Sequence, residues 1–227
     1  MITFKVETKG LAAMAARIAG MGKQVKFATA KSLTRTAWAV AKAERQEVDR
    51  AFDRPTKFVQ NAFRVEQATP VNLTATVSIK PKQAAILLPH IKGGRRGQKG
   101  FERKLASEAR ADGYWVPGAG VKLNAHGNMT LATIKQIAAG LQRSGKYGDV
   151  FVGVPKGMPS APFGIWARVT RGRGKKATGA IKPLLIKINQ PNYRKRFDFY
   201  GVAQRTVSRT FRAEFDKTIA DAIRTAR

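Results

Sequence analysis

Cysteine is absent from the 227-residue sequence, and histidine occurs only twice, as His90 and His126. Without thiols the chain forms neither disulfides nor thiolate metal sites, and two isolated histidines do not match a zinc site. We expect both histidines in loops or at the surface. No apolar run approaches the roughly 20 residues needed to cross a bilayer, and the first residues, MITFKVETKG, lack the apolar segment of a secretory signal. We therefore expect a soluble chain of cytoplasmic origin without metal, cofactor or membrane contact.

Acidic residues are also scarce, because 14 Asp and Glu stand against 43 Lys and Arg, for a formal net charge of +29. Between Gly113 and Phe197 there are 15 Lys and Arg residues and one acid, Asp149. Paired carboxylates for acid–base or two-metal chemistry are hard to assemble there, which disfavours a nuclease, and we expect no enzyme activity. Self-repulsion of this size calls for anionic partners, with nucleic acid the first candidate and acidic protein subunits the second.

One segment matches the spacing of a phosphate-binding loop. Residues 140–147 read GLQRSGKY, but Tyr147 replaces the Ser or Thr that would bind magnesium. The segment also follows a predicted helix, whereas a phosphate-binding loop follows a strand. We interpret Gly140 as the end of a helix and Gly145 as part of a turn.

The periodicity of apolar residues predicts an α+β fold. A long N-terminal helix and a C-terminal helix should pack on a mostly antiparallel sheet in a single domain, residues 1–227. Predicted helices cover residues 11–20, 23–52, 101–111, 130–141 and 199–226. Predicted strands cover residues 2–6, 63–66, 73–79, 150–154, 164–169 and 184–188. Residues 83–91 are apolar but fit either type.

Two glycine-rich basic segments, residues 92–100 (KGGRRGQKG) and 171–176 (RGRGKK), are predicted to be flexible projecting loops. Their glycines allow close approach to a phosphate surface, and aromatic residues are too few for base stacking. We expect sequence-independent electrostatic contact with double-stranded DNA. Docking on acidic neighbouring subunits and plain solvation remain alternatives. The candidate contact residues are Arg95, Arg96, Lys99, Arg171, Arg173, Lys175 and Lys176.

The N-terminal third carries a family resemblance. Residues 22–37 (GKQVKFATAKSLTRTA), the long helix and residues 52–58 (FDRPTKF) resemble the minor tail protein Z family of lambda-like phages. Residues 61–65 (NAFRV), 68–69 (AT) and 73–79 (LTATVSI) continue this resemblance, which covers about residues 8–80.

Members of that family are tail completion proteins, which finish the head-proximal end of the tail so that it can join the filled head. The resemblance implies a neck or tail component of the virion, assembled in the host cytoplasm beside the tail terminator and head–tail connector proteins. A homo-oligomeric ring near the DNA path would fit this role. The resemblance implies no catalytic residues. The alternative is a free, sequence-independent nucleic-acid-binding protein, which would explain the charge but not the FDRPTKF stretch.

Overall fold

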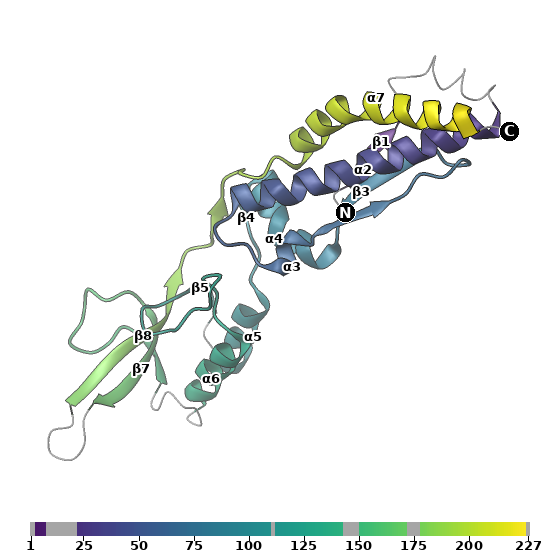
Figure 1. Ribbon diagram of the computed structural model, residues 1–227. Coiled ribbons are helices and arrows are strands. Elements are labelled where there is room, and N and C mark those ends of the chain that lie inside the picture. Colours follow the sequence, from purple (N-terminus) through teal and green to yellow (C-terminus); the bar gives the residue numbers. More distant parts are fainter. Residues whose placement is uncertain (1–2, 8–21, 110–111, 143–149, 172–177, 226–227) are drawn as a thin grey trace. The chain divides into compact units, whose positions relative to one another are not determined.

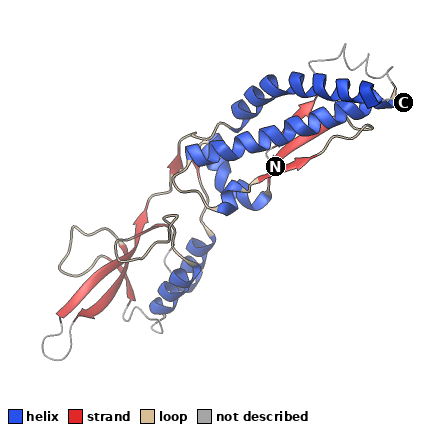
Figure 2. Ribbon diagram, in the orientation of Figure 1, coloured by secondary structure: helices blue, strands red, loops and turns tan. Residues whose placement is uncertain are grey.

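A computed structural model describes residues 3–7, 22–109, 112–142, 150–171 and 178–225 (Figure 1). The chain divides into two compact units. Unit 1 comprises Met1–Gly93 and Arg194–Arg227, and unit 2 comprises Gly94–Tyr193, so the second is inserted into the first. Both units combine helices with antiparallel strands (Figure 2), which confirms the α+β class. The sequence predicts one domain, whereas the structure has two units, each with its own core.

Unit 1 is built on two long helices and a three-stranded antiparallel sheet. Its elements are β1 (Thr3–Glu7), α2 (Lys23–Ala51), α3 (Lys57–Gln60), β2 (Phe63–Glu66), β3 (Thr74–Ile79), α4 (Pro81–Lys92) and α7 (Phe199–Thr225). The strand order is β1-β3-β2. Helix α2 packs on β2 and β3, while α7 lies mainly along α2 (Figure 1). The predicted long N-terminal and C-terminal helices are therefore confirmed.

The core of unit 1 explains why α2 forms without a side-chain cap. No side chain caps its N-terminus, so apolar burial must stabilise it. Leu33, Ala37, Val40 and Val48 are all buried and recur at helical spacing toward the sheet and α7. Four phenylalanines close one end of the same core, with ring centroids of Phe63 and Phe199 6.2 Å apart. They are Phe52, Phe63, Phe197 and Phe199.

Unit 2 pairs a four-stranded antiparallel sheet with two short helices. Its elements are β4 (Gly94–Arg95), α5 (Gly100–Ala109), β5 (Tyr114–Pro117), α6 (Leu131–Leu141), β6 (Val150–Gly153), β7 (Gly164–Arg171), β8 (Thr178–Ile188) and β9 (Asn192–Tyr193). The large sheet has the order β5-β8-β7-β6, and β4 pairs separately with β9. The register between β7 and β8 shifts between Ile165 and Trp166, next to Pro183 of β8. The nitrogen of Pro183 carries no hydrogen and cannot donate to the ladder.

Several predicted elements are confirmed within one or two residues, including α6, whose first turn is capped by the Thr130 hydroxyl. The ambiguous residues 83–91 form most of α4. The predicted helix over residues 11–20 lies outside the described residues. Within the described part of the chain, no helix is both long and apolar enough to cross a membrane.

Candidate polyanion interface

The structure describes four of the seven basic residues that the sequence predicts as contact residues: Arg95, Arg96, Lys99 and Arg171. Arg95 ends β4, and Arg96 and Lys99 follow it before α5 begins. Arg171 is the last residue of β7, opposite Thr178 of β8 in the antiparallel register. Residues 172–177 between them are not described, so the predicted contact residues Arg173, Lys175 and Lys176 lie outside the described residues.

The first basic segment is packed instead of projecting. Gly94 and Arg95 pair with Tyr193 and Asn192. The amide of Arg96 donates to the carbonyl of Pro191 at 3.3 Å. These backbone bonds hold residues 94–96 against β9 and the residue before it, so the prediction that the whole of residues 92–100 projects as a loop is wrong. Two of the glycines that suggested a loop serve a turn instead, because Gly93 and Gly94 adopt positive φ angles of 75° and 94°.

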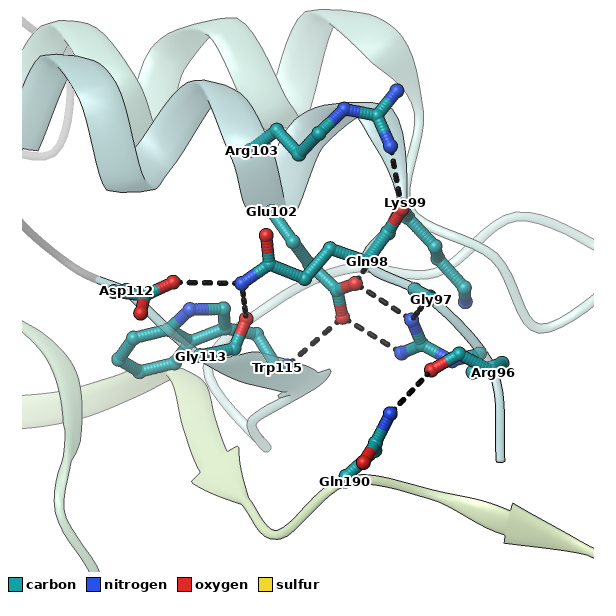
Figure 3. Close-up of polar contacts among 10 residues, drawn as sticks. All are labelled: Arg96, Gly97, Gln98, Lys99, Glu102, Arg103, Asp112, Gly113, Trp115 and Gln190. Atoms are coloured by element: carbon teal, nitrogen blue, oxygen red, sulfur yellow. Dashed lines mark hydrogen bonds and ion pairs between the residues drawn. The ribbon is translucent and has the colours of Figure 1, made fainter. Parts of the chain in front are cut away.

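Arg96 is committed to an internal ion pair with Glu102 (Figure 3). Its two terminal nitrogens, Nη1 and Nη2, lie 2.6 and 2.7 Å from the two carboxylate oxygens, the bidentate geometry that suits a guanidinium. The Tyr114 ring lies under the same guanidinium, 5.1 Å from centroid to Cζ. The side chain of Arg96 is only 10% exposed and that of Glu102 is fully buried. Arg96 therefore cannot serve as the phosphate contact that the sequence predicts.

Glu102 organises the chain around it. Its carboxylate also accepts hydrogen bonds from the amides of Lys99, at 2.5 Å, and Trp115, at 3.0 Å. Burial opposes ionisation of this carboxyl, but the hydrogen bonds from Arg96, Lys99 and Trp115 outweigh it and hold its pKa below the ordinary value. One charged group thus joins the basic segment, α5 and β5 (Figure 3).

Arg95 and Lys99 are exposed, and their role as contact residues stays a prediction. Sequence reasoning did not single out three further basic residues of unit 2, Arg168, Lys182 and Lys187, which the sheet presents with exposed side chains. Lys187 lies over Phe163, 5.4 Å from the ring centroid. The alternation of β7 and β8 could have indicated their exposure, but not which face of the sheet is covered by helices.

Arginine neutralises many of the acidic groups within the described chain. It supplies the cation in ion pairs distributed over both units: Arg35–Glu214, Arg50–Glu47, Arg54–Asp53, Arg64–Glu66, Arg96–Glu102, Arg205–Asp198, Arg212–Asp216 and Arg224–Asp221. Most of these pairs are exposed and contribute little stability. In each of these pairs a carboxylate is bound by an arginine and not by a lysine. Exposed lysines such as Lys31, Lys42 and Lys182 form no ion pair with a described residue. The excess positive charge is therefore displayed largely by lysine.

The structure contradicts the surface prediction for one of the two histidines, His90. His90 is buried near the end of α4, where its Nδ1 accepts a hydrogen bond from Arg196 Nε at 3.1 Å. Burial and then the neighbouring Arg196 lower its pKa to about 4, so the ring is neutral at physiological pH. The prediction of a surface position is wrong for His90, which joins α4 to the segment before α7. His126 is exposed, as expected.

No cluster of three or more His, Asp or Glu suited to a metal ion occurs among the described residues. Gly140 lies within α6, where a Cβ would come 2.5 Å from the Val150 side chain, so glycine there permits close helix–strand packing. Residues 143–149, the rest of the phosphate-loop-like segment, are not described. Comparison with protein-family models, curated proteins and solved structures finds no match for this chain.

Proposed function

We propose that this chain is a non-catalytic structural protein of a tailed phage, which completes the head-proximal end of the tail for joining to the head. The resemblance of residues 8–80 to the minor tail protein Z family supports this role. The physical observation that carries it is the net charge of +29, together with exposed lysines such as Lys31, Lys42 and Lys182 that form no ion pair with a described residue. A surface of this kind requires anionic neighbours, which the duplex and acidic subunits of a phage neck would supply.

A ring of copies around the DNA path is part of the proposal. If the ring were about 40 Å tall, it would surround roughly 24 phosphate charges, at one charge per 1.7 Å of duplex. Six copies would carry six times 29, or 174, positive charges. The enclosed duplex can offset only a small part of this charge. Much of the remainder should face acidic surfaces of the tail terminator and the head–tail connector.

Deletion of the gene from the phage that encodes it tests the role. We expect tail tubes of normal length that fail to join filled heads, counted by electron microscopy, and a loss of plaques that a plasmid copy restores. The reason is that a completion protein acts after the tube has polymerised. Normal infectivity of the deletion phage would overturn the proposal.

The alternative, a free nucleic-acid-binding protein, shares the same charge and needs a different measurement. Quantitative mass spectrometry of purified particles separates the two. A tail completion protein should be present at a constant copy number per particle, even after a wash in high salt that strips loosely bound basic proteins. Removal by the wash would favour the alternative.

A further inference from the structure

Helix α2 exposes only a narrow strip along most of its length. Between residues 27 and 45, the exposed positions are Phe27, Lys31, Trp38, Lys42 and Arg45. Their separations of four, seven, four and three residues place all five on one side of the helix. The remaining circumference faces α7, β2 and β3. The strip is about 27 Å long, for 18 residues at 1.5 Å each.

Two large aromatic side chains lie on this strip. Phe27 is 57% exposed and Trp38 is 54% exposed. The other two tryptophans, Trp115 and Trp166, are buried at 2% and 5% exposure. Phe27 and Trp38 lie 11 residues apart on the same side of α2, about 16 Å along the helix axis, with Lys31 between them. One extended or helical segment lying along α2 is long enough to contact both rings. Tryptophan is among the residues most enriched at the energetic centres of protein interfaces.

The charges of the strip have one sign. Lys31, Lys42 and Arg45 flank the aromatics, and no acidic residue is exposed between residues 27 and 45. Neither lysine forms an ion pair with a described residue. Arg45 donates its Nε–H to the carbonyl of Gln60 at 3.3 Å, and the side-chain amide of Gln60 in turn donates to the exposed Asp49, one turn further along α2, at 2.6 Å. Between residues 27 and 45 the strip therefore presents two aromatic side chains interspersed with three cations, and the first exposed acid on the same side follows at Asp49.

The candidate binding partners differ in how they would interact with the aromatic and cationic side chains of the strip. A second copy of the chain would bring the same cations into contact, and like charges disfavour that pairing. Duplex DNA would engage the cations through its phosphates but would leave the indole without an apolar partner, because sequence-neutral binding is dominated by backbone contacts. A protein segment with both apolar and acidic side chains matches the whole strip.

We propose that the Trp38 strip of α2 is the docking site for an acidic amphipathic segment of another protein. Apolar side chains of that segment cover Phe27 and Trp38, while its carboxylates pair with Lys31, Lys42 and Arg45. A helix of about 18 residues would span the strip. The inference goes beyond the proposed function, because it rests on the surface of α2 and does not depend on where the protein assembles.

The test uses the full-length protein and two dye-labelled synthetic helical peptides of equal negative charge. One carries a stripe of leucines bordered by glutamates, and the other has glutamine in place of each leucine. We expect the leucine peptide to bind more tightly in fluorescence anisotropy. Unlabelled leucine peptide should also shift the tryptophan emission to the blue, since Trp38 is the exposed tryptophan among the three.

Substitutions in the strip and in unit 2 test whether the peptide binds at the strip. Trp38→Ala, and separately the pair Lys31→Glu with Lys42→Glu, should each weaken binding of the leucine peptide by about tenfold or more, as expected for the centre of an interface. The matched controls lie in unit 2. They are Phe163→Ala, which removes an aromatic that is 46% exposed, and the pair Lys182→Glu with Lys187→Glu, which makes the same charge change. Each control should alter the affinity less than the corresponding strip variant.

Four results would overturn the proposal. Equal effects of strip and control variants, or equal binding of both peptides, would mean that only net charge matters. A blue shift on adding a short DNA duplex, lost in the lysine variant, would make the strip a nucleic-acid surface. Self-association of the free protein that Trp38→Ala abolishes, measured by sedimentation, would assign the strip to a second copy.

Discussion

Glu44 is an acidic residue in the interior of unit 1. It lies in α2 and is fully buried, and neither carboxyl oxygen has a hydrogen-bond partner within the described part of the chain. Burial above all, followed by repulsion from Glu47 and Asp198, raises its pKa to about 9. The carboxyl is therefore protonated in the folded protein at neutral pH, while the same group in the unfolded chain ionises near 4.5.

Replacing Glu44 with glutamine should stabilise the protein in a pH-dependent manner. At a pH below the unfolded value both states are protonated, so the shifted pKa has no effect there. As the pH rises toward 9, only the unfolded chain releases the proton, and stability is lost progressively. Glu44→Gln should remove this loss, on the order of 3 kcal/mol near neutral pH. Urea unfolding at several pH values measures it, and a gain that is independent of pH would contradict it. Asp216→Asn, at an exposed carboxylate, is the control.

Because Arg96 pairs with Glu102 and Arg95 is exposed, we expect alanine substitutions of these two adjacent arginines to differ in their effect on stability. Arg96→Ala leaves Glu102 buried without its cation, which should destabilise unit 2 by roughly 3–5 kcal/mol. Arg95→Ala changes an exposed side chain and should shift stability by less than about 0.5 kcal/mol. Thermal unfolding of the two variants compares adjacent residues of the same type. Similar melting temperatures would show that the pair does not support the fold.

At the scale of elements, the contact between α6 and β6 depends on one glycine. A Cβ at Gly140 would come 2.5 Å from Val150 Cγ2, and Val150 is buried at 7% exposure. Alanine is the better helix former by about 1 kcal/mol, but overpacking costs about 1–3 kcal/mol, so Gly140→Ala should be neutral to destabilising. Adding Val150→Ala to that variant should cost less than Val150→Ala alone, because the added methyl group then occupies the vacated space.

Gly100 provides the matched control for this substitution. It begins α5, and a Cβ there meets nothing within 4 Å. Gly100→Ala should therefore leave stability unchanged or raise it slightly. Chemical denaturation of the single variants and of the double variant gives the comparison. If Gly140→Ala raised the stability, Val150 of β6 would have to move away from α6 at little energetic cost, and the overpacking argument would be wrong.

At the scale of the whole molecule, the charge predicts salt-sensitive DNA binding without sequence preference. If the protein contacts about 6–10 phosphates, its affinity should fall by about 10³–10⁵ between 50 and 200 mM salt. Fluorescence anisotropy on two duplexes of unrelated sequence measures both properties. Weak salt dependence, or strong preference for one duplex, would contradict electrostatic binding.

The basic segments can be tested in the same assay with Arg96 retained. Arg95, Lys99, Arg171, Arg173, Lys175 and Lys176 are changed together to serine. DNA binding should weaken while the melting temperature stays nearly constant, since Arg95 and Lys99 are exposed and the Arg96–Glu102 pair is intact. In phage complementation, lost function with lost DNA binding would indicate contact with the genome. Lost function with DNA binding retained would indicate acidic subunits, and full function would remove both roles.

Local pattern alone determined most elements of this protein. The 3.6-residue period of apolar side chains located α2, α6 and α7, and strict alternation located β1, β3 and the end of β8, because each pattern records which face is buried. The α+β class followed from these elements. Composition likewise determined the positive charge and the lack of thiol chemistry.

Tertiary structure decided what depends on residues distant in sequence. The division into two units arises because the chain leaves unit 1 after Gly93 and returns at Arg194, and no change in local pattern marks that return. The glycines of residues 92–100 suggested a projecting loop, but β9 and Glu102 supply the partners that pack it. His90 is buried, and its ring accepts a hydrogen bond from Arg196, 106 positions later. Periodicity shows that a side chain is exposed or covered, whereas only the fold shows which charges meet. Arg96 therefore pairs with Glu102, while the adjacent Arg95 forms no ion pair with a described residue.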